Sequence, residues 1–108
     1  MSAATRVELR LLGAASLRIG PATHRLERKA AALLRVLALD GDTARSTLAA
    51  WLWPEPDAAG ARRNLRQRIF QLHRRAGREI VAGRQRLRLV IQGRHASQGV
   101  SYWVMPDA

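Results

Sequence analysis

The chain has 108 residues, the size of one compact domain with a single modest core. Its hydrophobic fraction of 47% and charged fraction of 25% are those of a globular protein and exclude a disordered chain. The chain has no cysteine, which excludes disulfides and thiolate zinc sites. It also has no apolar run long enough to span a membrane and no apolar segment typical of a signal peptide, so it is expected in the cytoplasm.

The charge of the chain is unusual. Lysine and arginine number 19 against 8 acidic residues, which gives a net charge of +11. All the basic residues except Lys29 are arginine; a GC-rich genome would explain that preference but not the net charge. So large an excess favours an anionic partner, most commonly nucleic acid, with acidic proteins and anionic membranes as alternatives.

Alternation of apolar and polar residues predicts strands in the first quarter of the chain. Residues 7–12 and 16–19 have this period, and a third short strand is predicted at 24–26. Gly20–Pro21 marks a turn. These segments are expected to form a small antiparallel sheet.

Helical spacing of apolar residues replaces this alternation from Glu27 onward. The first helix is expected to run from Glu27 to the Asp40–Asp42 turn. The longest helix is expected to follow Asp57 as its N-cap, to reach Ala76 and to stop at Gly77.

A short helix between these two is predicted over residues 46–53, with Ser46 as its N-cap. Leu48, Trp51 and Leu52 are expected to face the core. Core packing of Trp51 is favoured over base stacking because of its helical spacing from Leu48. Trp53 is expected to cover the corner between two helices.

The last third of the chain begins with a predicted β-hairpin. Residues 79–82 and 86–91 read as strands on either side of Gly83–Gln85. Residues 92–108 are expected to be a C-terminal tail, in which 101–104 form either an extra strand or a poorly ordered segment. The expected domain therefore covers residues 6–91.

The long helix carries the clearest functional signal. One stripe of apolar residues predicts its core face, and no acidic residue occurs between Ala58 and Arg78. Arginine, asparagine and glutamine are the side chains that read base edges in the major groove. A soluble helix and a helix lying on a membrane surface are the alternatives. The expected DNA-binding face consists of Arg63, Asn64, Arg66, Gln67, Gln71 and Arg74, with Arg62, Arg68 and Arg75 nearer the core edge.

The hairpin repeats the basic character with the period of a strand. Arg84, Arg86 and Arg88 are expected on one side, and Leu87, Leu89 and Ile91 on the other. Such a hairpin suits a wing that lies on DNA phosphates or in the neighbouring minor groove. Charges that protect an edge strand from aggregation are the alternative explanation.

Four segments together resemble one family. They are Leu11–Gly13, Arg28–Leu34, Leu52–Pro54 and Ala61–Gln67, that is LLG, RKAAALL, LWP and ARRNLRQ, and they have the order and spacing found in the OmpR-type winged helix-turn-helix domain. This domain stands at the N-terminus of the SARP antibiotic-regulatory activators and related bacterial transcriptional activator domain (BTAD) proteins. The similarity covers about residues 6–91.

The resemblance implies an α+β winged helix-turn-helix fold with an N-terminal antiparallel sheet, three helices and a C-terminal hairpin wing. It implies double-stranded DNA as the partner, and groove contacts from Arg63, Asn64, Gln67, Arg68 and Gln71. Phosphate contacts would come from the start of the second helix, at Arg45, Ser46 and Thr47. Residues 98–102 are faintly similar to the wing sequence of other OmpR-type proteins, which would place the wing later in the chain. The hairpin around Gly83–Arg86 is favoured as the wing because its apolar and basic residues alternate more clearly.

These expectations describe a bacterial DNA-binding transcription regulator in the cytoplasm, associated with the nucleoid. Contact with RNA polymerase and a homodimer on repeated half-sites are compatible with it. The alternative is a basic interaction module that docks on an acidic partner, such as RNA polymerase or another regulator. We expect no enzymatic activity, no cofactor and no metal, because His24, His73 and His95 lack ligand spacing and no catalytic motif occurs.

Overall fold

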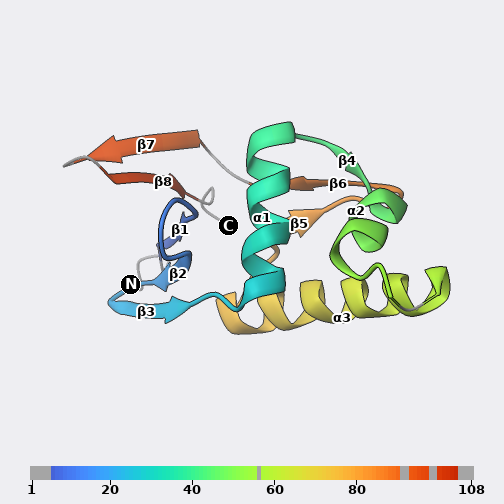
Figure 1. Ribbon diagram of the computed structural model, residues 1–108. Coiled ribbons are helices and arrows are strands. Elements are labelled where there is room, and N and C mark those ends of the chain that lie inside the picture. Colours follow the sequence, from blue (N-terminus) through green and yellow to red (C-terminus); the bar gives the residue numbers. More distant parts are fainter. Residues whose placement is uncertain (1–5, 56, 91–92, 98–99, 105–108) are drawn as a thin grey trace.

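The computed structural model describes residues 6–55, 57–90, 93–97 and 100–104. They form the predicted α+β layout of an N-terminal antiparallel sheet, three helices and a C-terminal hairpin (Figure 1). In chain order the elements are β1 (Val7–Arg10), β2 (Ser16–Ile19), β3 (Ala22–Arg25), α1 (Arg28–Asp40), β4 (Thr43–Ala44), α2 (Arg45–Leu52), α3 (Ala58–Ala76), β5 (Val81–Ala82), β6 (Arg86–Leu89), β7 (Gly93–Ser97) and β8 (Val100–Val104).

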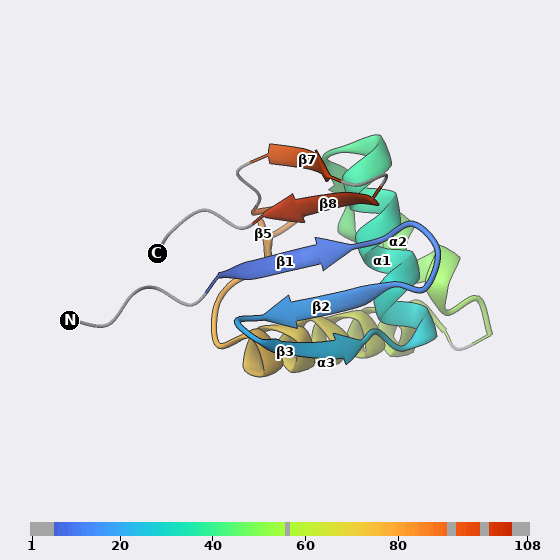
Figure 2. The same ribbon diagram turned by 90° about the vertical axis from the view of Figure 1, so that its left-hand side faces the viewer.

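Five strands form one antiparallel sheet in the order β3-β2-β1-β8-β7 (Figure 2). Leu9 of β1 lies opposite Leu17 of β2, and both side chains are fully buried. Alternate residues of a strand point to one face, so this pair faces the core while Arg18 remains exposed. The apolar face packs with residues of all three helices in a single core.

The last strands belong to this sheet, although residues 92–108 were expected to be a tail. Of the two alternatives for residues 101–104, the extra strand is correct, because β8 pairs with β1 through Leu9 and Trp103. Trp103 is only 5% exposed and is part of the core. The sequence does not predict β7, because Gly93–Ser97 has no alternation of apolar and polar residues. Residues 98–99 lie outside the described residues.

The ends of α3 follow the predicted capping chemistry, whereas Glu27 was expected inside the first helix and lies just before it. The Asp57 side chain accepts a hydrogen bond of 2.8 Å from the Gly60 N–H at the start of α3. Gly77, with a left-handed φ of 70°, ends that helix. Glu27 accepts a bond of 2.7 Å from the Ala30 N–H and is therefore the N-cap of α1, just outside the first turn.

The start of α2 differs from the prediction. The helix begins at Arg45, and its N-cap is Ala44, with no side-chain hydrogen bond, so the prediction of Ser46 as N-cap was wrong. The cause is β4, which pairs with β6 and leads directly into the helix. The Arg45 N–H donates to the Gln85 carbonyl over 2.7 Å, so the hairpin satisfies one of the N–H groups that have no partner within the helix.

Trp51 was predicted to face the core, but it is 60% exposed. The buried face of α2 is formed by Leu48, Ala49 and Leu52, and the small Ala49 brings that face toward α3. Trp51 lies about a quarter of a helical turn away from the centre of this buried face and therefore points out of the core. Trp53 does pack against the core, with the Lys29 ammonium 5.7 Å from its ring centroid.

The hairpin is also confirmed, with shorter strands than predicted. β5 and β6 pair through Val81–Leu89 and Ala82–Arg88, and β4 completes a three-stranded sheet in the order β4-β6-β5. The two sheets lie on opposite sides of α1 (Figure 1). The β5–β6 hairpin extends from α1 on the same side as α2 (Figure 1). The bond from the Arg45 N–H to the Gln85 carbonyl places the loop of the hairpin beside the start of α2.

The hairpin loop requires glycine at position 83. Gly83 has a φ of +112°, and a Cβ there would lie 1.9 Å from the carbonyl oxygen of Arg86. We expect Gly83→Ala to lower the free energy of unfolding by about 1–3 kcal/mol, measured by urea unfolding. Gly13→Ala is the control, because Gly13 has a φ of +72° with open space around it. Equal losses in the two variants would contradict the collision with Arg86.

Candidate nucleic-acid interface

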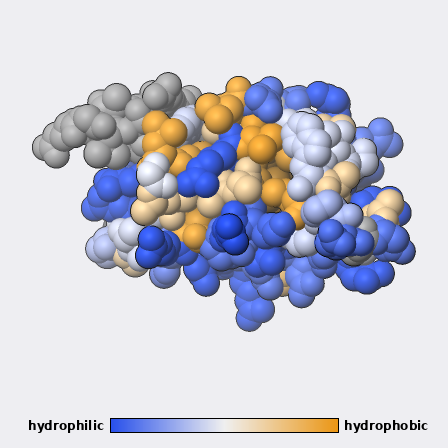
Figure 3. All heavy atoms as spheres, in the orientation of Figure 1, coloured by the Kyte–Doolittle hydropathy of each residue, from blue (hydrophilic) through white to orange (hydrophobic). Residues whose placement is uncertain are grey.

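The outer face of α3 is exposed along its length. The helix runs along one edge of the molecule with no other element over its outer side (Figure 1), and hydrophilic residues gather at that edge (Figure 3). The buried stripe contains Leu65, Ile69 and Leu72, as predicted. The opposite face exposes Arg63, Arg66, Gln67, Phe70, Gln71 and Arg74, while Asn64 and Arg68 are half-buried.

Arg68 lies on the flank of α3 that faces α1. Its Nη1 is 3.3 Å from the Glu27 Oε1, and its side chain is 30% exposed. Because Glu27 also caps α1, this ion pair connects α3 to the start of that helix. A base contact by Arg68 would require this ion pair with Glu27 to break. The DNA contact predicted for Arg68 therefore stays a prediction.

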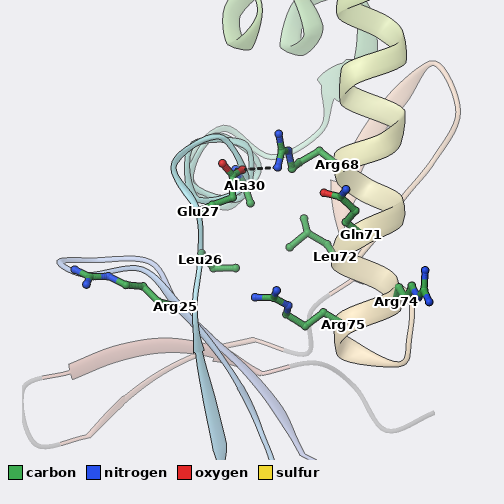
Figure 4. Close-up of a pocket in the computed structure, with 9 residues that line it drawn as sticks. All are labelled: Arg25, Leu26, Glu27, Ala30, Arg68, Gln71, Leu72, Arg74 and Arg75. Atoms are coloured by element: carbon green, nitrogen blue, oxygen red, sulfur yellow. Dashed lines mark hydrogen bonds and ion pairs between the residues drawn. The ribbon is translucent and has the colours of Figure 1, made fainter.

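A hollow of about 500 Å³ opens beside this ion pair. Its apolar floor is formed by Leu26, Ala30 and Leu72, and it lies between the start of α1 and the second half of α3 (Figure 4). Arg75 points into the gap beside Leu72, whereas Arg74 points away from it (Figure 4). We call the arginines that border this hollow, other than Arg68, the β3-side cluster: Arg25, Arg74 and Arg75.

A second hollow, of about 490 Å³, lies on the other flank of α3, between the wing and the start of α2. Its arginines come from three elements and the wing loop, and no acidic side chain of the described residues lines it. We call them the wing-side cluster: Arg45, Arg62, Arg84 and Arg86. Arg45, Arg62, Arg63 and Arg66 also line an adjoining hollow of about 370 Å³, so the basic surface continues onto α3.

Hydrogen bonds hold two members of the wing-side cluster in place. The Arg45 Nε donates to the Arg84 carbonyl over 2.6 Å, and the Arg86 Nη2 donates to the Asp42 carbonyl over 2.8 Å. Both acceptors are backbone oxygens, so these contacts position the guanidinium groups without neutralising their charge. Such a group of positive charges, with no acid among the described residues that line it, attracts anions.

The predicted phosphate contacts are only partly brought together. Arg45 and Ser46 line the wing-side hollow, but Thr47 is half-buried and does not line it. Arg88 is exposed on β6 and lies outside the hollow lining. Arg62 was placed at the core edge by helix geometry and missed as a site residue, because the sequence does not show on which flank of α3 the wing lies.

His73 is half-buried at the last turn of α3. This burial lowers its pKa below the ordinary value of 6.5, and the charge of Glu79 opposes the shift. The Val81 N–H donates to Nε2 over 3.1 Å, a bond that requires an unprotonated Nε2. Neutral His73 therefore connects α3 to the first strand of the wing.

This arrangement predicts a pH-dependent stability. Since the folded-state pKa is below the unfolded-state value, the contribution of His73 is complete above pH 6.5 and is lost as the pH falls toward the folded-state pKa. We expect the wild type to lose more stability than His73→Gln between about pH 7.5 and pH 5, measured by urea unfolding. The glutamine side chain of this variant can accept the Val81 bond but does not titrate. Parallel pH profiles would contradict this role.

The described residues hold neither a metal site nor a membrane-spanning helix. No group of three or more histidine, cysteine, aspartate or glutamate side chains there is arranged to hold a metal ion. In the same part of the chain, no helix combines the length and the apolar character that crossing a bilayer requires.

Comparisons of the chain with protein-family models, with curated proteins and with solved structures found no match. The resemblance to the OmpR-type domain therefore stays a prediction, and the case for a function depends on the geometry described above.

Proposed function

We propose that this chain is the DNA-binding domain of a transcription regulator, with α3 in the major groove and the β5–β6 hairpin as a wing on the backbone or in the adjacent minor groove. The observation that carries this proposal is the placement of two arginine clusters on opposite flanks of one exposed, acid-free helix face.

The dimensions of α3 suit this role. Its 19 residues give a length of about 28 Å, and the major groove is about 12 Å wide and admits one helix. The outer face would meet base edges through Arg63, Gln67 and Gln71, the side-chain types that form bidentate bonds with guanine and adenine.

In the proposed complex the two clusters would meet the two DNA strands that border a groove. The wing-side cluster lies beside the first half of α3, at Arg62, and the β3-side cluster beside the second half, at Arg74 and Arg75. A helix inserted into the major groove has a sugar-phosphate strand on each side. Phosphate contacts of this kind set the register and supply most of the affinity, while the base contacts supply the choice of sequence.

Salt dependence tests the proposal. Duplex affinity would be measured by fluorescence anisotropy between about 50 and 200 mM salt. If most arginines of the two clusters contact phosphates, log K should fall against log[salt] with a slope of about −4 to −6. Arg18→Ala is a matched control, because Arg18 is exposed on β2 outside both clusters, and it should keep the wild-type slope.

Absence of duplex binding at the lowest salt would contradict the proposal and favour the alternative, in which the basic face docks on an acidic protein. RNA polymerase contact and a homodimer on repeated half-sites remain predictions within the proposed function.

A further inference from the structure

Phe70 is an apolar side chain in the middle of the basic face of α3. It is 61% exposed and is not part of the core. Arg66 and Arg74 lie one turn before and one turn after it, and Gln67 lies three residues before it. Because helical side chains lean toward the N-terminus, the Phe70 ring covers the surface between Arg66 and Gln67.

The surroundings of Phe70 restrict what it contacts. Isolated exposed apolar residues are common on protein surfaces and need no partner. Leu12, Leu39 and Trp51 are such residues and lie outside α3. Phe70 differs because its exposed neighbours one turn away are Arg66, Gln67 and Arg74, beside the half-buried His73, and no acid occurs in residues 58–78. A surface that complements it must be anionic and must offer an apolar group at this point.

The major groove offers such a surface. Guanine, adenine and cytosine present hydrogen-bonding atoms there, and thymine adds a C5-methyl group. Phenylalanine is among the side chains that contact this methyl group.

We propose that Phe70 contacts the C5-methyl group of one thymine in the bound duplex and so specifies a T·A pair at one position of the site. This inference rests on the proposed function, because it requires α3 to lie in the major groove. It adds a specificity-determining residue that makes no hydrogen bond.

The experiment removes the methyl group from the DNA and the ring from the protein. A duplex selected by the wild-type chain from a randomised pool would be prepared with each thymine replaced, one at a time, by deoxyuridine, which lacks only that methyl group. Affinities would be measured for the wild type, Phe70→Ala and Phe70→Leu. At one thymine we expect deoxyuridine to weaken wild-type binding about fourfold, the equivalent of one buried methyl group.

Phe70→Ala should bind the thymine duplex and the deoxyuridine duplex equally. Its affinity for both should be about the affinity of the wild type for the deoxyuridine duplex. Phe70→Leu should keep part of the discrimination. Because Phe70 is exposed, all variants should unfold like the wild type. Leu39→Ala is the matched control: Leu39 is 73% exposed near the end of α1 that lies away from α3 (Figure 1), and this variant should keep the full deoxyuridine effect.

Two different results overturn the inference. If the wild type selects a sequence but loses the same affinity to deoxyuridine as Phe70→Ala, Phe70 does not read thymine and the proposed function stands. If the wild type selects no sequence, the inference fails together with sequence-specific DNA binding.

Discussion

Trp103→Ala should lower the free energy of unfolding by about 3–5 kcal/mol, the usual loss for a large aromatic residue removed from a core. Trp103 is 5% exposed, lies opposite Leu9 across β8 and β1, and belongs to the single core. Urea unfolding followed by circular dichroism would measure the loss.

Trp51→Ala is the matched control for this prediction. It removes the same side chain from a position that is 60% exposed, and its effect should be within about 0.5 kcal/mol. A small loss for Trp103→Ala would mean that the sheet does not need β8 and that residues 92–108 behave as the tail predicted from the sequence.

Gln67→Ala should relax base preference at one position of the DNA site, by about 1–3 kcal/mol between the preferred base pair and the others. Gln67 is exposed on the outer face of α3. Its side chain forms no hydrogen bond with residues 6–55 or 57–90. The amide is therefore available for a bidentate bond with an adenine edge. Affinities for a set of single-substitution duplexes would show the effect.

Arg84→Ala is the comparison for Gln67→Ala. Arg84 lies in the wing, and its removal should weaken binding to all sequences alike and reduce the magnitude of the salt slope by about 1. If Gln67→Ala also weakened every duplex equally, α3 would contribute affinity without reading bases.

Much of the fold could be predicted from the sequence where local patterns decide it. The stripe of α3 that includes Leu65 and Leu72 repeats with the helical period, and Asp57 and Gly77 stand where capping chemistry requires them. The hairpin around Gly83 was predictable for the same reason, since its strands alternate and its loop carries glycine.

The errors occur where partners distant in the sequence decide the structure. Ser46 has the chemistry of an N-cap, but β4 pairs with β6 and brings the Gln85 carbonyl to the Arg45 N–H. Trp51 has helical spacing from Leu48, but the packing of α2 on Ala49 turns it outward. β7, which the sequence does not predict, pairs with β8, and β8 in turn pairs with β1 at the other end of the chain.

The candidate site shows the same division. Arg63, Gln67 and Gln71 were predictable because the face opposite an apolar stripe must be exposed. Arg62 was missed because its role depends on the side of α3 at which the wing lies. Phe70 was overlooked although helix geometry already places it on the exposed face, beside Arg66 and Arg74.

The central claim is that the exposed face of α3 reads DNA sequence. Selection of duplexes from a randomised pool by the purified chain, at about 150 mM salt, tests it most directly. We expect one enriched motif, bound more tightly than unselected duplex by about a thousandfold or more. Binding without any enrichment, or no binding, would contradict the claim.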